Sequence, residues 1–316
     1  MLYLNDHDFS NLSISWEDSI NEIKKALSCI SREDYFQPLK PYLRFGDKTN
    51  RIIAMPAYVG GNIDMAGIKW IASFPNNINN NIPRASSITI LNDSSTGVPL
   101  AIFNTAIISI IRTVSVSGFL LKEYSSFKQQ SKYSVGIIGF GPIGQYHLKM
   151  CKSLLKNHID NIYLYDKRDI TISDEIVTMC NSWQEVYKKS DIFITCTSSL
   201  ERYIDLPALH EKLILDVSLR DFKEESLNSF TKPFIVDDWD EVNRENTDIE
   251  YYTKIKGIDK KDTITLCDIQ NNKLSSFYKK GDVIFFAPMG MGVFDITIAN
   301  YYYKYAIKNN IGTCLD

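Results

Sequence analysis

The sequence predicts an α/β protein in which a Rossmann-type, doubly wound parallel sheet is joined to a smaller α+β domain. One observation is a short apolar run, 135–138, followed by the pattern G-x-G-x-x-G, a helical pattern and a second apolar run, 162–165. Another is a series of β-like runs in the N-terminal third, with little helix between them. A chain of 316 residues is long enough for two domains, each with its own core.

In the N-terminal third we expect a strand at 2–5, a helix at 16–31 with its apolar residues on one face, and five further strands. Turns rich in glycine and asparagine separate the β-like runs. Consecutive strands of this kind predict an antiparallel or mixed sheet. The five runs are 42–45, 51–58, 68–74, 88–91 and 100–104.

A long helix, 106–124, then carries the expected domain boundary. Beyond it, β-like runs alternate with helical segments, which predicts a parallel sheet. The later runs are 192–195, 213–217, 234–236 and 283–286. A last helix, 294–309, is rich in tyrosine and is expected to cross back to the first domain. The expected domains are therefore 1–115 with 295–316, and 116–294.

The glycine-rich turn is predicted to bind the diphosphate of a dinucleotide. The first glycine permits a tight turn, the second lets a pyrophosphate approach the backbone, and the third lets the helix pack on the strand. The helix N-terminus adds unpaired N–H groups and the positive end of a dipole. Another α/β fold with a chance glycine pattern is the alternative. The turn consists of Gly139, Phe140, Gly141, Pro142, Ile143 and Gly144.

Asp166, at the end of the second apolar run, is predicted to select the cofactor. An acid at this position accepts hydrogen bonds from the ribose hydroxyls, and its charge repels a 2′-phosphate, so we expect NAD rather than NADP. Lys167 and Arg168 follow directly and weaken that preference.

Composition excludes several classes of protein. The net charge of −3 argues against nucleic acid or an anionic membrane as the main partner. No run is long and apolar enough to span a bilayer, and the N-terminus lacks the pattern of a signal peptide, so we expect a cytoplasmic protein. The six cysteines include no C-x-x-C pair, and no histidines have metal-ligand spacing, so we expect reduced thiols and no metal. His147 is interpreted as a packing or surface residue.

Four cations stand in the first domain where β-like apolar runs do not need them: Arg44, Lys69, Arg84 and Arg112. Lys69 and Arg112 lie within strongly apolar runs, and a buried unpaired charge is costly, so each should have an anionic partner. For any one of these cations, an internal salt bridge to Asp or Glu is as good an explanation as a bound substrate anion. Four together, beside a cofactor domain, favour a pocket for a carboxylate-rich substrate.

At this point the chain resembles the ornithine cyclodeaminase/μ-crystallin family over nearly its whole length. The resemblance includes the Lys69 strand, Arg112-Thr113, the glycine-rich turn, Thr195-Cys196-Thr197-Ser198 and Pro288-Met289-Gly290 before the Asp295 helix. Within the family it is most similar to the siderophore-pathway members that make 2,3-diaminopropionate. The segments that carry this similarity are 36–44, 51–56, 67–71, 84–86 and 236–239. Ala287 departs from the asparagine common in that subgroup.

The resemblance implies roles for particular residues. Lys69 matches the catalytic lysine, and Arg44 and Arg112 match residues that bind the substrate α-carboxylate with it. Asp221 matches an acid/base residue, although a shift of one position would place Arg220 there. Arg84 is our hypothesis for a second carboxylate, with pairing across a dimer interface as the alternative. The implied NAD contacts are Thr113, Gly139, Gly141, Pro142, Ile143, Gly144, Asp166, Thr195, Cys196, Thr197, Met289 and Gly290.

The activity that the resemblance implies is NAD-dependent oxidation of N-(2-amino-2-carboxyethyl)-L-glutamate, followed by hydrolysis to 2-oxoglutarate and L-2,3-diaminopropionate. This would supply siderophore or peptide natural-product biosynthesis. The first domain would bind substrate and pair with its twin in a homodimer. An ornithine cyclodeaminase or imine reductase acting on a simpler amino acid is an alternative. A non-catalytic μ-crystallin-like protein that binds the cofactor is another.

Overall fold

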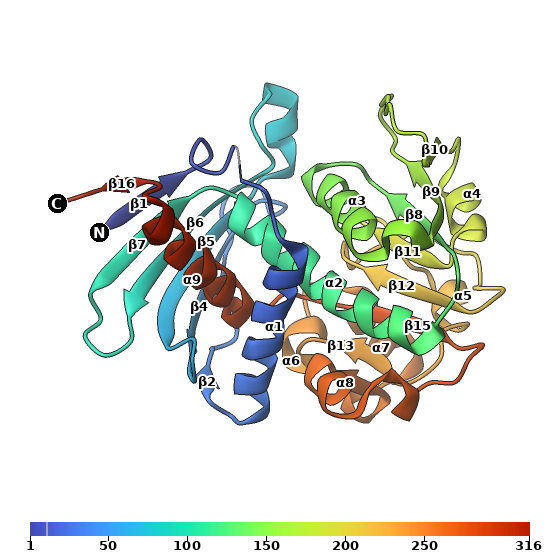
Figure 1. The fold of residues 1–316 in the computed structure, drawn as a ribbon. Coiled ribbons are helices and arrows are strands. Elements are labelled where there is room, and N and C mark those ends of the chain that lie inside the picture. Colours follow the sequence, from blue (N-terminus) through green and yellow to red (C-terminus); the bar gives the residue numbers. More distant parts are fainter. Residues whose placement is uncertain (11) are drawn as a thin grey trace. The chain divides into compact units, whose positions relative to one another are not determined.

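The computed structural model describes residues 1–10 and 12–316, which form two compact units (Figure 1). Unit 1 comprises Met1–Val116 and Gly290–Asp316, and unit 2 comprises Ser117–Met289. The first boundary lies within helix α2 (Ile107–Lys128), along which the sequence placed it. The second falls five residues earlier than expected, because Gly290 associates with unit 1, where its carbonyl accepts a hydrogen bond from Lys40.

Unit 1 contains a mixed sheet, as the sequence predicts. Its strands are β1 (Leu2–Asn5), β2 (Tyr35–Phe36), β3 (Tyr42–Leu43), β4 (Arg51–Val59), β5 (Met65–Ser73), β6 (Ala85–Asp93), β7 (Pro99–Asn104) and β16 (Thr313–Cys314). Their order is β16-β1-β7-β6-β5-β4-β2, and β3 pairs with β4. Strands β1 and β7 run parallel, whereas β4, β5, β6 and β7 form an antiparallel series.

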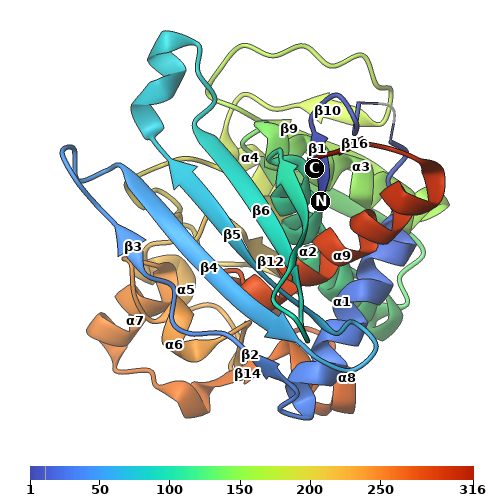
Figure 2. The same ribbon diagram turned by 90° about the vertical axis from the view of Figure 1, so that its left-hand side faces the viewer.

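Two long helices and the 3-10 helix η1 (Pro75–Asn80) complete unit 1. Helix α1 (Trp16–Ser31) begins where the Ser15 side chain accepts a hydrogen bond from the Asp18 backbone N–H, and it buries an apolar face. Helix α9 (Gly292–Asn309) packs against α1, β4, β5 and β6, as Figures 1 and 2 show. Its residues 292–300 are all buried, which places Asp295 inside the unit.

Unit 2 contains a sheet in which every strand pair is parallel, and this confirms the predicted Rossmann-type fold. Its strands are β8 (Tyr133–Ile138), β9 (Ile159–Tyr165), β10 (Val177–Met179), β11 (Ile192–Thr195), β12 (Lys212–Asp216), β13 (Phe234–Val236), β14 (Thr263–Thr265) and β15 (Val283–Ala287). The order is β10-β9-β8-β11-β12-β15-β13-β14. The order reverses between β8 and β11, and ligands of such sheets bind beyond the carboxyl ends of the strands at this point.

The helices of unit 2 connect these strands. They are α3 (Pro142–Leu155), η2 (Lys156–His158), α4 (Trp183–Lys189), α5 (Glu224–Leu227), α6 (Trp239–Val242), α7 (Asp248–Lys256), η3 (Lys260–Asp262), α8 (Leu266–Asn272) and η4 (Leu274–Ser276). Part of the core is an aromatic cluster in which Phe222 contacts both Phe230 and Phe285 edge-on, and the latter two rings stack on each other. Within residues 1–10 and 12–316, no helix has the length and apolar character needed to cross a membrane.

Candidate active site

The glycine-rich turn lies between β8 and α3, at the point where the strand order reverses. Gly139 has φ of 85°, and a Cβ atom there would lie 2.6 Å from the Cys196 carbonyl oxygen after β11. A Cβ atom at Gly144 would lie 2.1 Å from the Gly139 carbonyl oxygen. Both positions therefore require glycine. Gly139 has a positive φ and lies against the segment after β11, and Gly144, in the first turn of α3, lies against the Gly139 carbonyl.

Gly141 differs from the other two glycines of the turn. A Cβ atom there would meet no heavy atom within 4 Å, and its φ of −73° is open to any residue. The chain therefore does not need glycine here for its own packing, and the open space is what a pyrophosphate needs to approach the backbone. Gly141 also precedes α3, whose N-terminus has no described side-chain cap. These features fit the diphosphate of a dinucleotide.

Asp166, directly after β9, has both carboxylate oxygens engaged within the chain. Its Oδ2 accepts hydrogen bonds from the Phe140 backbone N–H at 2.6 Å and from Arg168 Nη2 at 2.8 Å. Its Oδ1 accepts from the backbone N–H and from Nε of Arg168, each at 2.9 Å. The Arg168 hydrogen bonds, against the opposing effect of burial, lower the pKa of Asp166 to about 2, so it is ionised at neutral pH.

The end of β11 adjoins the same turn. The Cys196 backbone N–H donates to the Ile138 carbonyl at 2.7 Å, and the Thr197 N–H donates to Ser218 Oγ at 3.0 Å. Thr195 Oγ1 donates to the Oδ1 atom of Asp216 at 3.1 Å. The segment predicted to contact the cofactor therefore lies at the reversal of strand order, beside Gly139.

The remaining positions predicted to contact the cofactor have well-defined local partners. The Met289 N–H donates to Asp237 Oδ1 at 3.0 Å in unit 2. Thr113 Oγ1 donates to the Ser109 carbonyl at 2.8 Å on α2 in unit 1. Their cofactor roles stay predictions.

Lys69 is at the centre of β5 and is only 1% exposed. Its Nζ donates to Asp295 Oδ1 at 2.9 Å and to Ser109 Oγ at 3.2 Å. Arg112 Nε donates to the same Asp295 oxygen at 2.9 Å. One carboxylate thus holds both cations that the sequence placed in apolar runs.

Burial, together with the positive charge of Arg112, lowers the pKa of Lys69 to about 7, although Asp295 opposes the change. A lysine with this pKa exists in both protonation states near neutral pH, as a group that takes up and releases a proton must. A structural lysine paired one-to-one with an acid would instead keep its charge.

Sequence reasoning did not assign two members of this cluster. Asp295 is fully buried, and its Oδ2 has no hydrogen-bond partner in the described chain. The sequence feature that could have identified Asp295 is that it is a single acid in the otherwise apolar start of the last helix. Lys40 is also buried; its Nζ donates to the Gly290 carbonyl at 2.7 Å, and its charge contributes to the lowered pKa of Lys69. We know of no sequence signal that distinguishes Lys40 from a surface lysine.

The other two predicted cations have different surroundings. Arg44 is exposed; its Nη1 donates to the Lys48 carbonyl at 3.2 Å, and its guanidinium lies 5.4 Å from the centre of the Tyr42 ring. Arg84 is half-buried, and its carbonyl accepts a hydrogen bond from the Phe74 N–H. The hydrogen bonds of Asp295 thus connect two of the four predicted cations, Lys69 and Arg112. The substrate roles of Arg44 and Arg84 stay predictions.

Asp221 is fully buried in unit 2, and hydroxyl groups occupy both of its oxygens. Thr197 Oγ1 donates to Oδ1 at 2.7 Å and Ser218 Oγ donates to Oδ2 at 2.5 Å. Its backbone N–H donates to Asp248, whose other oxygen accepts from Arg202 Nε at 2.6 Å. This network fixes the loop after β12. Arg220, the alternative by one position, donates to the Glu245 carbonyl.

Two neighbouring acids have raised pKa values. Burial, followed by the charges of Asp248 and Asp221, raises the pKa of Asp216 well above its usual range. Burial also raises the pKa of Asp248 to about 6, although backbone N–H groups and Arg202 oppose the change. Burial therefore favours the protonated form of Asp216. In the described part of the chain, no three His, Cys, Asp or Glu side chains are grouped so as to hold a metal ion.

His147 is buried on α3, and each of its ring nitrogens has a hydrogen-bond partner. Nδ1 lies 2.8 Å from the Ile143 carbonyl and Nε2 lies 2.9 Å from Ser117 Oγ. Burial lowers the pKa of His147 to about 4. It is a packed, neutral residue, which agrees with the first of the two interpretations made from the sequence.

Comparisons with known proteins identify the family of this chain. The model of the ornithine cyclodeaminase/mu-crystallin family matches residues 6–310. An N-((2S)-2-amino-2-carboxyethyl)-L-glutamate dehydrogenase of Staphylococcus aureus is 32% identical over an alignment covering 100% of this chain and 98% of that protein. The family expected from the sequence is thereby confirmed.

Two solved structures share the fold over the whole chain. A Thermococcus litoralis Δ1-pyrroline-2-carboxylate reductase, in complex with NADH and L-proline, has a TM-score of 0.84 at 22% identity and covers 100% of both chains. An archaeal alanine dehydrogenase dimer with bound NAD has a TM-score of 0.76 at 21% identity, covering 100% of this chain and 99% of that one. Relatives of this chain are thus dehydrogenases and reductases, some of them solved with NAD or NADH.

Proposed function

Because this chain belongs to the ornithine cyclodeaminase/mu-crystallin family, we propose that it is an NAD-dependent dehydrogenase of a carboxylate-rich amino acid. The proposed substrate is N-(2-amino-2-carboxyethyl)-L-glutamate, and the products are 2-oxoglutarate and L-2,3-diaminopropionate. The observation that carries the proposal is the burial of Lys69 and Arg112 around the single carboxylate of Asp295. Two cations and one acid leave a positive charge that a substrate carboxylate balances. The name of the Staphylococcus aureus relative supports the choice of substrate.

The proposed reaction balances with one NAD and one water. The C–H bond at the glutamyl α-carbon breaks, and its hydride goes to NAD, which supplies the acceptor. The amine nitrogen loses its proton, and a C=N bond forms. Water then adds to that carbon, the C–N bond breaks, and the two products leave with NADH and one proton.

Unit 1 has the substrate role in this proposal. Arg112 binds the α-carboxylate, and positioning of this kind supplies a large part of the barrier reduction. Lys69, with its pKa near 7, accepts the amine proton in its neutral form. Arg44 and Arg84 are proposed to bind the substrate carboxylates as well.

Unit 2 has the cofactor role. The open space at Gly141 and the N-terminus of α3 receive the diphosphate. The loops that follow β9 and β11 contact the rest of the cofactor. Asp221 is proposed to activate water. Because Asp221 is fully buried and each of its oxygens accepts a hydroxyl hydrogen bond, it is proposed to reach a water molecule through the hydroxyl of Thr197 or of Ser218.

We also propose a cytoplasmic homodimer that supplies diaminopropionate to siderophore or peptide biosynthesis. The archaeal alanine dehydrogenase, solved as a dimer, supports the oligomeric state. Light scattering of the purified protein tests it directly.

The test of the function is a substrate comparison. Purified protein is incubated with NAD and synthetic N-(2-amino-2-carboxyethyl)-L-glutamate, with ornithine and alanine in parallel, while NADH absorbance and 2-oxoglutarate are measured. NADH and 2-oxoglutarate in equal amounts from the tricarboxylate alone are expected. Turnover of ornithine without net NADH would identify a cyclodeaminase. Cofactor binding with no turnover of any amino acid would identify a binding protein.

A further inference from the structure

The hydrogen-bonding capacity of Asp166 is filled by its own chain. An ionised carboxylate offers about four acceptor sites. Asp166 uses four: the Phe140 N–H and the Nη2 group of Arg168 on one oxygen, and the N–H and Nε group of Arg168 on the other. The hydroxyl donors of an NAD ribose therefore find Asp166 occupied. They reach it only by displacing the Arg168 guanidinium.

Arg168, in contrast, keeps donors to spare. A guanidinium carries five N–H groups in a planar fork, and this one uses two of them on Asp166. The other three donate to no described residue, and 66% of the side chain is exposed to solvent. Its fork is held in place by a bidentate ion pair, which fixes where the remaining donors point.

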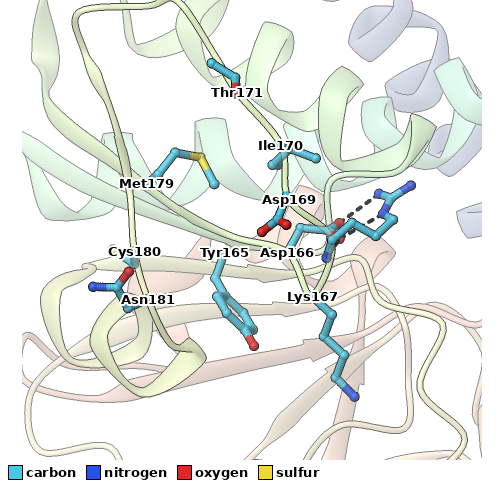
Figure 3. A pocket seen from close by; sticks show the side chains of 10 residues that line it. Tyr165, Asp166, Lys167, Asp169, Ile170, Thr171, Met179, Cys180 and Asn181 are labelled. Carbon is cyan, nitrogen blue, oxygen red and sulfur yellow. Dashed lines mark hydrogen bonds and ion pairs between the residues drawn. The ribbon is translucent and has the colours of Figure 1, made fainter.

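These donors lie at a pocket of about 570 Å³ beyond the end of β9 (Figure 3). The pocket is formed by the loop after β9 together with the end of β10, and it is lined by both members of the Asp166–Arg168 pair. In Figure 3 the Lys167 side chain points away from Asp166. Asp169 also lines the pocket, and its negative charge would oppose the binding of an anion there.

We propose that Arg168 lets this pocket accept a ribose 2′-phosphate, so that the chain binds NADP as well as NAD. A 2′-phosphate brings acceptor oxygens, and these meet the spare N–H groups of Arg168 while the ion pair to Asp166 stays intact. The ion pair also neutralises Asp166, which on its own would repel a phosphate. The inference rests on the proposed function only in requiring that unit 2 binds a dinucleotide.

The test measures binding, so it does not depend on turnover. NADH and NADPH are titrated against the full-length protein by nicotinamide fluorescence, with isothermal calorimetry of NAD and NADP as a second readout. The wild-type protein is expected to bind NADPH within about tenfold of NADH, since the occupied Asp166 gives the NADH ribose no advantage and the spare N–H groups of Arg168 bind the 2′-phosphate. Arg168→Ala is expected to weaken NADPH by about tenfold or more and to leave NADH unchanged or tighter, because Asp166 is then free for the ribose.

Two further variants define the mechanism. Arg168→Lys keeps the charge but loses the fork, and it is expected to give a Kd ratio between those of wild type and Arg168→Ala. Lys167→Ala removes a neighbouring charge that points elsewhere and is expected to leave the ratio unchanged. The inference is overturned if the wild type binds NADH at least about 100-fold more tightly than NADPH. It is also overturned if Arg168→Ala weakens both cofactors equally. Binding of neither cofactor would overturn the proposed function as well.

Discussion

Lys69 Nζ lies 2.9 Å from Asp295 Oδ1, although 226 positions separate the two residues in the sequence. The lysine is on a central strand of the unit 1 sheet, and the acid is in the first turn of the helix that packs on this sheet. Asp295 also accepts a hydrogen bond from Arg112. This one carboxylate therefore fixes the position of both cations proposed to act on substrate, and it opposes the lowering of the Lys69 pKa by burial.

Replacing Asp295 should damage the protein in two measurable ways. Asp295→Asn leaves two buried cations without a counter-charge, and removing one partner of a buried ion pair costs about 3–5 kcal/mol. The free energy of unfolding in urea should fall by that order. Ser109→Ala is the matched control, because it removes only an uncharged acceptor of the same Nζ and should cost less, about 1.5 kcal/mol. Equal losses in the two variants would contradict a special role for Asp295.

The pH dependence of activity should report Lys69. Its pKa is near 7, and its neutral form is proposed to accept a proton, so kcat/KM should rise with pH below 7 and level off above it. Lys69→Arg stays protonated throughout and should lose about 100-fold or more in kcat while losing that limb of the profile. A pH profile that is unchanged in Lys69→Arg would remove Lys69 from proton transfer.

Two of the three glycines of the cofactor turn, Gly141 and Gly144, should respond differently to the same change. Gly141→Ala meets no atom in the protein, so the variant should fold with wild-type stability but bind NADH about tenfold or more weakly, because the methyl group occupies the approach of the diphosphate. Gly144→Ala would place its Cβ 2.1 Å from the Gly139 carbonyl and should lose both stability and binding. Thermal unfolding and fluorescence titration separate the outcomes. Normal NADH binding by Gly141→Ala would place the diphosphate elsewhere.

His147 should make the protein sensitive to acid. Its pKa is about 4 in the folded state and about 6.5 when unfolded, so the unfolded chain binds more protons between these values. The stability contribution is complete above pH 6.5 and is lost as the pH falls toward 4, by about 3 kcal/mol. His147→Gln cannot titrate, so its stability should vary less over this window. Urea unfolding from pH 4 to 7 measures the difference, and parallel curves would show that His147 does not contribute.

Arg84 should distinguish substrates by their number of carboxylates. Arg84→Ala is expected to raise KM for N-(2-amino-2-carboxyethyl)-L-glutamate by about tenfold, the value of one charged hydrogen bond, with little change in kcat. An Arg84→Lys control should restore part of the loss. An unchanged KM would end the proposal that Arg84 binds a second carboxylate.

Local patterns in the sequence were sufficient for the parts of this protein that depend on neighbouring residues. The apolar run, glycine turn, helix and acid between 135 and 166 predict one strand–turn–helix–strand unit, because the period of each element and the geometry of a tight turn are local properties. The helix at 16–31 and the strands at 192–195 and 234–236 were predicted with their observed bounds. Short strands such as β10 and β14 were not foreseen, since three residues carry too little pattern.

By itself the sequence thus determined that the chain has a dinucleotide-type turn ending at an acid, and that Lys69 and Arg112 stand where a charge needs a partner. Only the tertiary structure decided what those groups touch. The packing of α9 on the sheet chose Asp295 as the partner, and the direction of the loop after β9 let Arg168 occupy Asp166. The physical reason is that periodicity fixes which face a side chain is on, whereas hydrogen-bond partners depend on how distant elements pack and on distances of a few tenths of an ångström.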